Sequence, residues 1–195
     1  MAKNLIVIPC CKRKIPGGVI KAAPLTYFDN PSLVPTLIAK RAISMDLNPP
    51  IKPFEFMEAW DRYDGGLYRN LKLCQPLINN LINRDCLDII IISALYGVIN
   101  YNTPINNYDL TMTIAHRKLW ENSISNSINN YCEATNIKTV YTFLRPDTYY
   151  SVTTNGVLLN HTQIWPIGIR GVNNIYNNVA NNIIGLLDKI NKECK

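Results

Sequence analysis

The chain has 195 residues, of which 47% are apolar and 17% are charged. This length predicts a single domain over residues 1–195, and the apolar share excludes an intrinsically disordered chain. Lysine and arginine outnumber aspartate and glutamate by 20 to 14, and the resulting net charge of +6 permits an anionic partner without requiring one.

No apolar run is long enough to cross a bilayer, since Asp88 and Ser93 interrupt the most apolar stretch. The N-terminal residues lack the long apolar core of a signal peptide, so we expect a cytoplasmic protein without a membrane partner. None of the six cysteines forms a C-x-x-C pair, which argues against a zinc site. We expect no cofactor, and cytoplasmic thiols are expected to be reduced.

The first part of the chain predicts a strand followed by a helix. Residues 5–8 are an apolar run that ends at a proline, as in a buried strand. Residues 32–45 have helical periodicity, with Asn30 as a capping residue and Pro31 suited to the first turn. Three prolines within residues 48–53 exclude a regular helix and predict a surface connection.

The middle of the chain predicts further helices and strands. Apolar residues recur at helical spacing over residues 67–81, where Pro76 is expected to kink or interrupt the helix. Residues 88–93 contain four consecutive isoleucines and predict a central, parallel strand that is buried on both faces. A helical stripe over residues 120–131 precedes a further strand at residues 139–143.

The C-terminal part completes the predicted fold. Residues 164–169 suggest one more short strand, and residues 172–190 have the spacing of a long amphipathic helix. Strands that alternate with helices are joined by crossovers, which place the helices on the faces of a parallel sheet. The sequence therefore predicts an α/β fold: a single domain with a largely parallel or mixed central sheet flanked by helices.

Polar and basic residues follow three of the predicted strands. Because the carboxyl ends of parallel strands meet at one edge of a sheet, we expect these residues to lie together there, where open α/β sheets bind ligands. The first loop contains Cys10, Cys11, Lys12, Arg13 and Lys14, the second contains Ser93, Tyr96 and Gly97, and the third contains Arg145, Asp147, Tyr149 and Tyr150.

The first loop admits two interpretations. Lys12 and Arg13 can hold a phosphate through their charge and the guanidinium fork, or they can be ordinary solvated cations. The neighbouring cations can also activate the thiols of Cys10 and Cys11, although packing at the end of a strand is the more common role of such residues.

The other segments supply hydrogen-bonding and aromatic groups. Ser93 and Tyr96 can bond a ligand, or Tyr96 can pack in the core, while Gly97 permits a positive φ angle or the close approach of a ligand. Tyr68 and Arg69 follow two glycines in a segment that mixes aromatic residues with arginine. This composition suits stacking on bases and contact with phosphates.

A long polar loop is predicted after the central strand, and long loops in compact domains are often functional. It contains Tyr108 and Asp109. The tyrosine can stack on a base, whereas Asp109 can bond a base edge or act as a general base near a sugar.

Five segments carry a resemblance to a known family: residues 7–14 (VIPCCKRK), 65–69 (GGLYR), 92–99 (ISALYGVI), 108–112 (YDLTM) and 166–171 (PIGIRG). In this order they resemble the signature blocks of the YaaA-like superfamily, which comprises the peroxide-stress YaaA proteins and their shorter relatives. The resemblance implies a cytosolic protein linked to protection of DNA from oxidative damage, in a family with a DNA-binding member that has a basic cleft. It implies no settled catalytic residue.

Three hypotheses remain open, and the sequence does not determine the oligomeric state. The leading hypothesis is a nucleic-acid-binding or nucleotide-binding protein. The second is an enzyme that cleaves a glycosidic bond to a base, as a DNA glycosylase or nucleoside hydrolase does, with Asp109 or Asp64 as the carboxylate. The third is a thiol redox sensor. The predicted ligand-binding residues are Cys10, Lys12, Arg13, Tyr68, Arg69, Ser93, Tyr96, Gly97, Tyr108, Arg145 and Tyr149.

Overall fold

The computed structural model describes residues 3–18, 25–146, 149, 161–166 and 171–194. The central sheet has the strand order β4-β3-β1-β6-β7, and a second sheet pairs β2 with β5. The strands are β1 (Lys3–Pro9), β2 (Lys52–Glu58), β3 (Leu87–Ser93), β4 (Gly97–Asn100), β5 (Pro104–Asn107), β6 (Ile137–Thr142) and β7 (His161–Gln163). The helices are η1 (Tyr27–Asp29, a 3-10 turn), α1 (Pro35–Leu47), α2 (Ala59–Arg62), α3 (Gly66–Lys72), α4 (Gln75–Asn83), α5 (Ile114–Trp120), α6 (Ser123–Ala134) and α7 (Val172–Glu193).

Strand β1 organises the central sheet through parallel pairing. It pairs with β3 on one side and with β6 on the other, and β6 pairs in parallel with β7. Strand β4 runs antiparallel to β3. Leu5, Val7 and Ile8 of β1 are fully buried, as expected for a strand covered on both faces. The predicted α/β fold with a mixed, mostly parallel sheet is confirmed.

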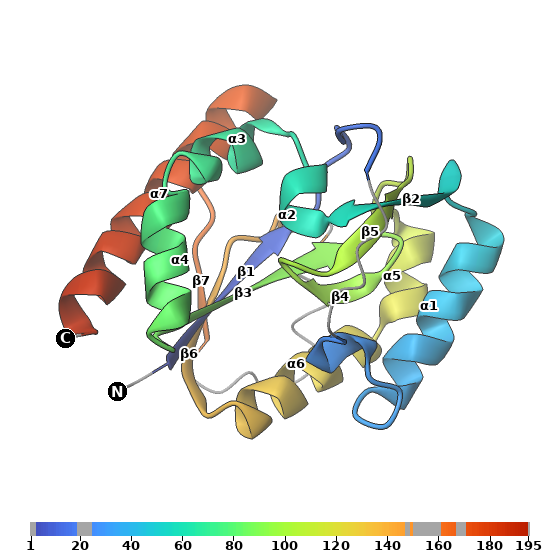
Figure 1. The fold of residues 1–195 in the computed structure, drawn as a ribbon, viewed down its shortest axis with the longest axis horizontal. Coiled ribbons are helices and arrows are strands. Elements are labelled where there is room, and N and C mark those ends of the chain that lie inside the picture. The colour runs from blue at the N-terminus through green and yellow to red at the C-terminus, as the bar shows by residue number, and fades with distance from the viewer. Residues whose placement is uncertain (1–2, 19–24, 147–148, 150–160, 167–170, 195) are drawn as a thin grey trace.

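Helices cover both faces of this sheet (Figure 1). On one face α7 contacts α3 and α4, and α4 contacts β3. On the other face α1 contacts α5 and α6, and α6 contacts β4 and β6. Helix α4 lies in the connection from β1 to β3, and α6 lies in the connection from β3 to β6. The two crossovers therefore lie on opposite faces of the sheet, as in doubly wound folds.

Prolines set two of the helix boundaries. Helix α1 begins at Pro35 instead of residue 32, and proline suits this first position. Residues 30–33 form a separate turn before the helix, in which the Asn30 side chain accepts a hydrogen bond from the Ser32 backbone N–H at 2.9 Å. Pro76 interrupts the helix predicted around it, so α3 and α4 are separate helices. It lies in the first turn of α4, where the missing N–H of proline has no intrahelical partner to lose.

Two other predicted elements have different boundaries. The stripe over residues 120–131 belongs to two helices, α5 and α6, because Asn122 between them takes a left-handed conformation with a φ of 63°. Residues 164–166 are not in a strand, since β7 ends at Gln163, opposite the last residue of β6. Residues 167–170 lie outside the described residues.

The loop predicted after the central strand contains two strands. Strand β4 turns back beside β3, and β5 pairs with β2 in an antiparallel ladder. The proline-rich segment over residues 48–53 therefore leads into a strand, since β2 begins at Lys52. Strand β2 pairs only with β5 in its two-stranded sheet, and an edge strand tolerates Pro53. This pairing joins segments that are distant in sequence, and no local pattern reveals it.

Helix α7 confirms the predicted C-terminal amphipathic helix. Its buried residues Val179, Ile183, Leu187 and Ile190 recur at helical spacing and face the core. Within the described part of the chain, no helix combines the length and apolar character needed to span a membrane.

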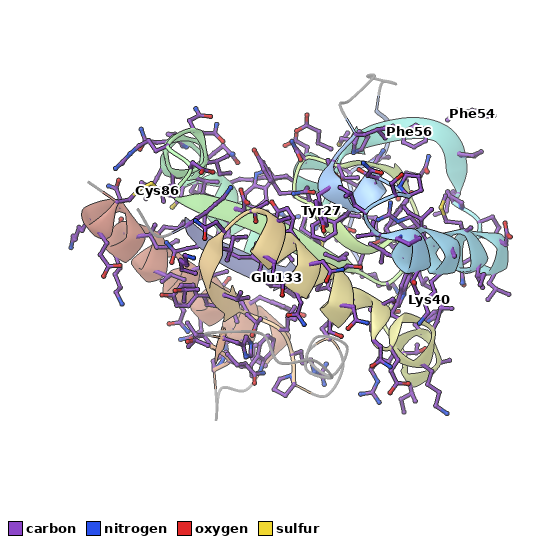
Figure 2. All side chains as sticks on the ribbon, turned by 90° about the horizontal axis from the view of Figure 1, so that it is seen from below. Tyr27, Lys40, Phe54, Phe56, Cys86 and Glu133 are labelled. Atoms are coloured by element: carbon purple, nitrogen blue, oxygen red, sulfur yellow. A yellow bond between two sulfur atoms is a disulfide. The ribbon has the colours of Figure 1, made fainter. Side chains whose placement is uncertain are left out.

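A disulfide joins Cys86 to Cys194, which corrects the expectation that all the thiols are reduced. Cys86, which lies on the left in Figure 2, precedes β3, and Cys194 follows the last turn of α7. The two residues are 108 positions apart in sequence, and the packing of α7 along α4 brings their Cα atoms to 6.2 Å. The free cysteines are Cys10, Cys11, Cys74 and Cys132.

A thiol titration tests this bond. In denaturant without reductant, we expect four reactive thiols, and six after reduction. Reduction is expected to lower the free energy of unfolding by about 4–5 kcal/mol, because the bond closes a loop of roughly 100 residues in the unfolded chain. Cys74→Ser is the control, since it removes a thiol outside the bond. Six thiols before reduction would contradict the assignment.

Candidate functional site

A cavity of about 730 Å³ lies at the carboxyl edge of the central sheet. It is bordered by the loop after β1, the start of α3, the segment after β6 and the first turns of α7. The parallel register of β1 with β3 and β6 confirms that the predicted strand-end loops meet at one edge. The predicted residues that line this strand-end cavity are Cys10, Lys12, Arg13, Tyr68, Arg69, Arg145 and Tyr149.

Residues 10–14, which we call the basic loop, are held in place by hydrogen bonds. The Arg13 carbonyl accepts from the Asp64 backbone N–H and from the Cys11 thiol, both at 3.0 Å. The Cys11 sulfur in turn accepts from the Gly65 backbone N–H at 3.2 Å. A Cβ atom at position 65 would lie 3.0 Å from the Cys11 side chain, so this close approach favours glycine.

Lys14 supports the basic loop from the inside. Its ammonium donates to the carbonyls of Cys11 and Lys12, both at 3.2 Å, and lies 3.8 Å from the centroid of the Tyr108 ring. Burial lowers the pKa of Lys14, while the carbonyls and the ring face stabilise its charge. Lys14 therefore has a structural role, whereas Lys12 and Arg13 are exposed.

Asp64 orders two of the guanidinium groups at the cavity. Arg69 donates to it from Nε at 3.0 Å and from a terminal nitrogen at 2.7 Å, and Arg13 Nε lies 2.9 Å from the same carboxylate. The hydrogen bonds from Arg69 are the main cause that lowers the pKa of Asp64, and the pKa of Arg69 is raised in return. Asp64 is thus ionised at neutral pH and holds both arginines at the cavity rim.

The sulfur and aromatic groups at the floor of the cavity are held by buried contacts with one another and with the backbone. The Cys10 sulfur lies 3.3 Å from the Tyr149 hydroxyl, and the Tyr68 hydroxyl donates to the Pro9 carbonyl at 2.9 Å. Burial raises the pKa of Cys11 to about 11, so at neutral pH it is a thiol that donates a hydrogen bond. These contacts favour packing roles for the two adjacent thiols over redox sensing.

Ser93 and Tyr108 do not line the strand-end cavity. Ser93 is fully buried and Tyr108 is 2% exposed. The Tyr108 hydroxyl lies 2.9 Å from the Ser93 hydroxyl and 2.6 Å from the Tyr63 hydroxyl. Ser93 also accepts from the backbone N–H groups of Leu95 and Tyr96, which closes the turn after β3. This network supports the site from within the core.

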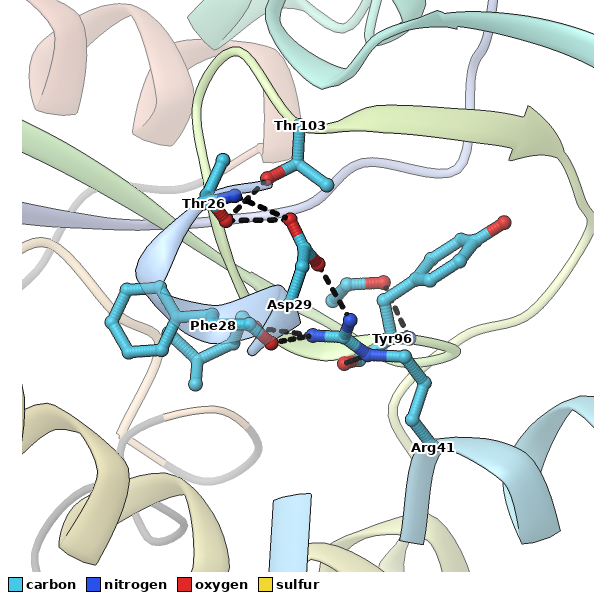
Figure 3. Close-up of polar contacts among 8 residues, drawn as sticks. Thr26, Phe28, Asp29, Arg41, Tyr96 and Thr103 are labelled. Atoms are coloured by element: carbon cyan, nitrogen blue, oxygen red, sulfur yellow. Dashed lines mark hydrogen bonds and ion pairs between the residues drawn. The ribbon is translucent and has the colours of Figure 1, made fainter. Parts of the chain in front are cut away.

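Tyr96 and Gly97 are also structural. The Tyr96 hydroxyl donates to the Asn106 side chain at 2.9 Å. The Tyr96 carbonyl accepts from Arg41 Nε at 2.9 Å (Figure 3). Arg41 also pairs with Asp29 at 2.8 Å, so one guanidinium fixes the turn against α1 and η1. Gly97 has the positive φ expected from the sequence, 73°, and a Cβ there would lie 2.7 Å from the Trp120 ring.

Asp109 lies outside the lining of the strand-end cavity. It is exposed and borders a second hollow of about 540 Å³, which also includes Lys12 and Arg13. The structure therefore places Asp109 by the basic loop, in a different hollow from Asp64. In the third predicted loop, Asp147 and Tyr150 lie outside the described residues.

Two lining residues, Tyr176 and Asn177 of α7, were not singled out by the sequence. The Asn177 side chain accepts from Asn70 of α3 at 3.0 Å, which joins the two helices at the cavity. No local signal identifies them, because a polar helix face rich in asparagine has the same pattern when it faces only solvent.

Comparisons with known proteins supply no assignment: the chain matches no protein-family model and no curated protein sequence.

Tyr108→Phe tests the structural role of Tyr108. The change leaves the buried Tyr63 hydroxyl without this partner, so we expect the free energy of unfolding in urea to fall by about 1–3 kcal/mol. Tyr101→Phe is the control, since its partly buried hydroxyl has no hydrogen bond among the described residues. Unchanged stability combined with weaker ligand binding would place Tyr108 in the binding site instead.

The raised pKa of Cys11 predicts slow alkylation. Near neutral pH, iodoacetamide should modify Cys11 in the folded protein far more slowly than in the unfolded chain, as followed by peptide mass spectrometry. Because the folded state binds this proton more tightly, the stabilising contribution of Cys11 is complete below its unfolded pKa of about 8.5. It is lost as the pH rises towards 11. Rapid modification at neutral pH would favour a redox-sensing thiol.

Proposed function

We propose that the protein binds a nucleic acid or nucleotide in the strand-end cavity, with its phosphate at the basic loop. The observation that carries this proposal is the charge of the cavity rim. Four basic residues, Lys12, Arg13, Arg69 and Arg145, line the cavity, and Asp64 is the single carboxylate among its described lining residues. The lining thus has a formal charge of +3, which favours an anion.

The chemistry of the basic residues suits phosphate in particular. Arginine presents a planar fork of N–H donors that matches two oxygens of a phosphate, and lysine adds a mobile point charge. Asp64 orients Arg13 and Arg69 before a ligand arrives, which reduces the entropy lost on binding.

The floor of the cavity suits the nucleoside. Met112 and Tyr149, which keep a small exposed fraction, and the half-buried Tyr176 supply apolar and aromatic surface against which a sugar or base can pack, while the fully buried Tyr68 packs beneath them. The volume of about 730 Å³ lies within the usual range for small-molecule sites. Apolar walls with a few fixed polar groups are typical of such sites.

The ordered motifs support a proposed YaaA-like relationship. Residues 7–14, 65–69 and 108–112, which resemble that family, all contribute to the cavity lining. On this basis we propose a cytoplasmic role in protecting DNA from oxidative damage. The Cys86–Cys194 disulfide argues against a cytoplasmic location, because such bonds are rare in cytoplasmic proteins. Recovery of the protein outside the cytoplasmic fraction of cells would contradict this part of the proposal.

Glycosidic cleavage is less well supported by the geometry than binding. Asp64 lines the cavity, but both of its carboxylate oxygens are engaged by Arg69 and Arg13, and its lowered pKa makes it a weak general base. Asp109 lines the second hollow and not the strand-end cavity, so the two candidate carboxylates do not share one site as a carboxylate pair would. Release of free base from modified DNA or from a nucleoside, lost in Asp64→Asn or Asp109→Asn, would favour an enzyme.

Lys12→Ala and Arg13→Ala test phosphate binding. Each should weaken binding of a fluorescein-labelled single-stranded DNA oligonucleotide and should reduce the slope of log K against log salt by about one unit in anisotropy titrations. Lys192→Ala is the matched control, since this exposed lysine lies near the opposite end of α7 and changes the net charge equally. Unchanged binding by the double variant would contradict the proposal.

A further inference from the structure

The basic loop separates two hollows. Lys12 and Arg13 line both the strand-end cavity and the second hollow. The second hollow is also lined by Lys14, Ile51, Asn107, Tyr108 and Asp109. The loop is therefore a basic ridge shared by the deeper strand-end cavity and the shallower, more open second hollow.

The backbone of the ridge is fixed by hydrogen bonds. The bonds are those of Cys11, Lys14 and Asp64 described above, so the positions of the two exposed cations are set by a rigid support. The Arg13 side chain is 68% exposed, and Asp64 engages its Nε. Among the described residues its terminal nitrogens have no partner, which leaves the planar end of the guanidinium for a phosphate.

The second hollow has the surface chemistry of a base-binding site. Ile51 is 62% exposed and offers an apolar surface for a ring. Asn107 and Asp109 add donor and acceptor groups of the kind that read the edges of unpaired bases. The Asp109 carboxylate repels a phosphate, so an anionic linkage is favoured on the ridge and a neutral base in the hollow.

We infer that the protein binds a single-stranded nucleic acid of at least two nucleotides, with the linking phosphate on the ridge and one nucleoside in each hollow. This inference rests on the proposed function and specifies its ligand. The order of groups along the strand, nucleoside, phosphate and nucleoside, matches the order of hollow, ridge and hollow. A mononucleotide fills only one hollow, and a duplex keeps its bases paired and stacked.

Calorimetric titration with short synthetic ligands tests the inference. The probes are 5′-dAMP, the dinucleotide d(ApA) without a terminal phosphate, and d(ApA) with an uncharged methylphosphonate linkage. We expect d(ApA) to bind about tenfold more tightly than 5′-dAMP, which is within the range for stacking one further base. Since d(ApA) carries less negative charge than 5′-dAMP, charge alone cannot produce this gain. The dinucleotide with the methylphosphonate linkage should not show this gain in affinity.

Ile51→Ala addresses the second hollow directly. The substitution should remove the difference in affinity between d(ApA) and 5′-dAMP. Because the Ile51 side chain is highly exposed, the substitution is not expected to disturb folding. Ile43→Ala, an exposed isoleucine of α1 outside both hollows, should retain the difference. The same titration with the RNA dinucleotide ApA identifies the preferred sugar, and the gain with either sugar supports the inference.

The outcomes separate the two proposals. Equal affinities for 5′-dAMP and both dinucleotides would overturn the two-hollow inference and leave nucleotide binding in place. A gain that persists with the uncharged linkage would overturn the position of the phosphate on the ridge. No binding of these probes or of the longer oligonucleotide would overturn both the inference and the proposed function.

Discussion

The parallel pairing of β1 with both β3 and β6 is the constraint on which the candidate site depends. Parallel strands end at the same edge, so the register that aligns Pro9 with Ile92 also brings the basic loop beside the turn after β3. The pairing of β1 with β6 brings Arg145 to the same edge from the other side. A cavity made from distant segments thus follows from backbone hydrogen bonds in the core.

Charge at this edge is organised by a division of roles among the basic residues. Lys14 is half-buried against the Tyr108 ring and holds the loop backbone, while Lys12 and Arg13 are exposed. Asp64 neutralises part of the rim, but it also fixes the guanidinium groups that border the cavity. One half-buried cation and two exposed ones give a rigid support with accessible charge, which the proposed phosphate contact requires.

Helix α7 connects the candidate site to the opposite end of the molecule. Its first turns contribute Tyr176 and Asn177 to the strand-end cavity, and Cys194 beyond its last turn is joined to Cys86 before β3. The position of the cavity wall is therefore held at both ends of one 22-residue helix. The hydrogen bond between Asn70 and Asn177 joins α7 to α3, and the disulfide fixes the other end of α7 where it packs beside α4.

The sequence by itself determined the α/β fold, the three parallel strands β1, β3 and β6, the helices α1, α3, α4, α6 and α7 with shifted boundaries, and the convergence of basic residues at strand ends, because these follow from local periodicity and the geometry of parallel sheets. It did not reveal β2, β4 and β5, which depend on pairing between other segments. Only the tertiary structure decided which members of each motif face the cavity. Arg69 lines it, whereas Ser93, Tyr96 and Tyr108 are buried in hydrogen-bonded networks. A hydroxyl looks the same in sequence whether it contacts a ligand or another side chain. Its role is set by which distant segments pack around it, and local pattern contains no information about that packing.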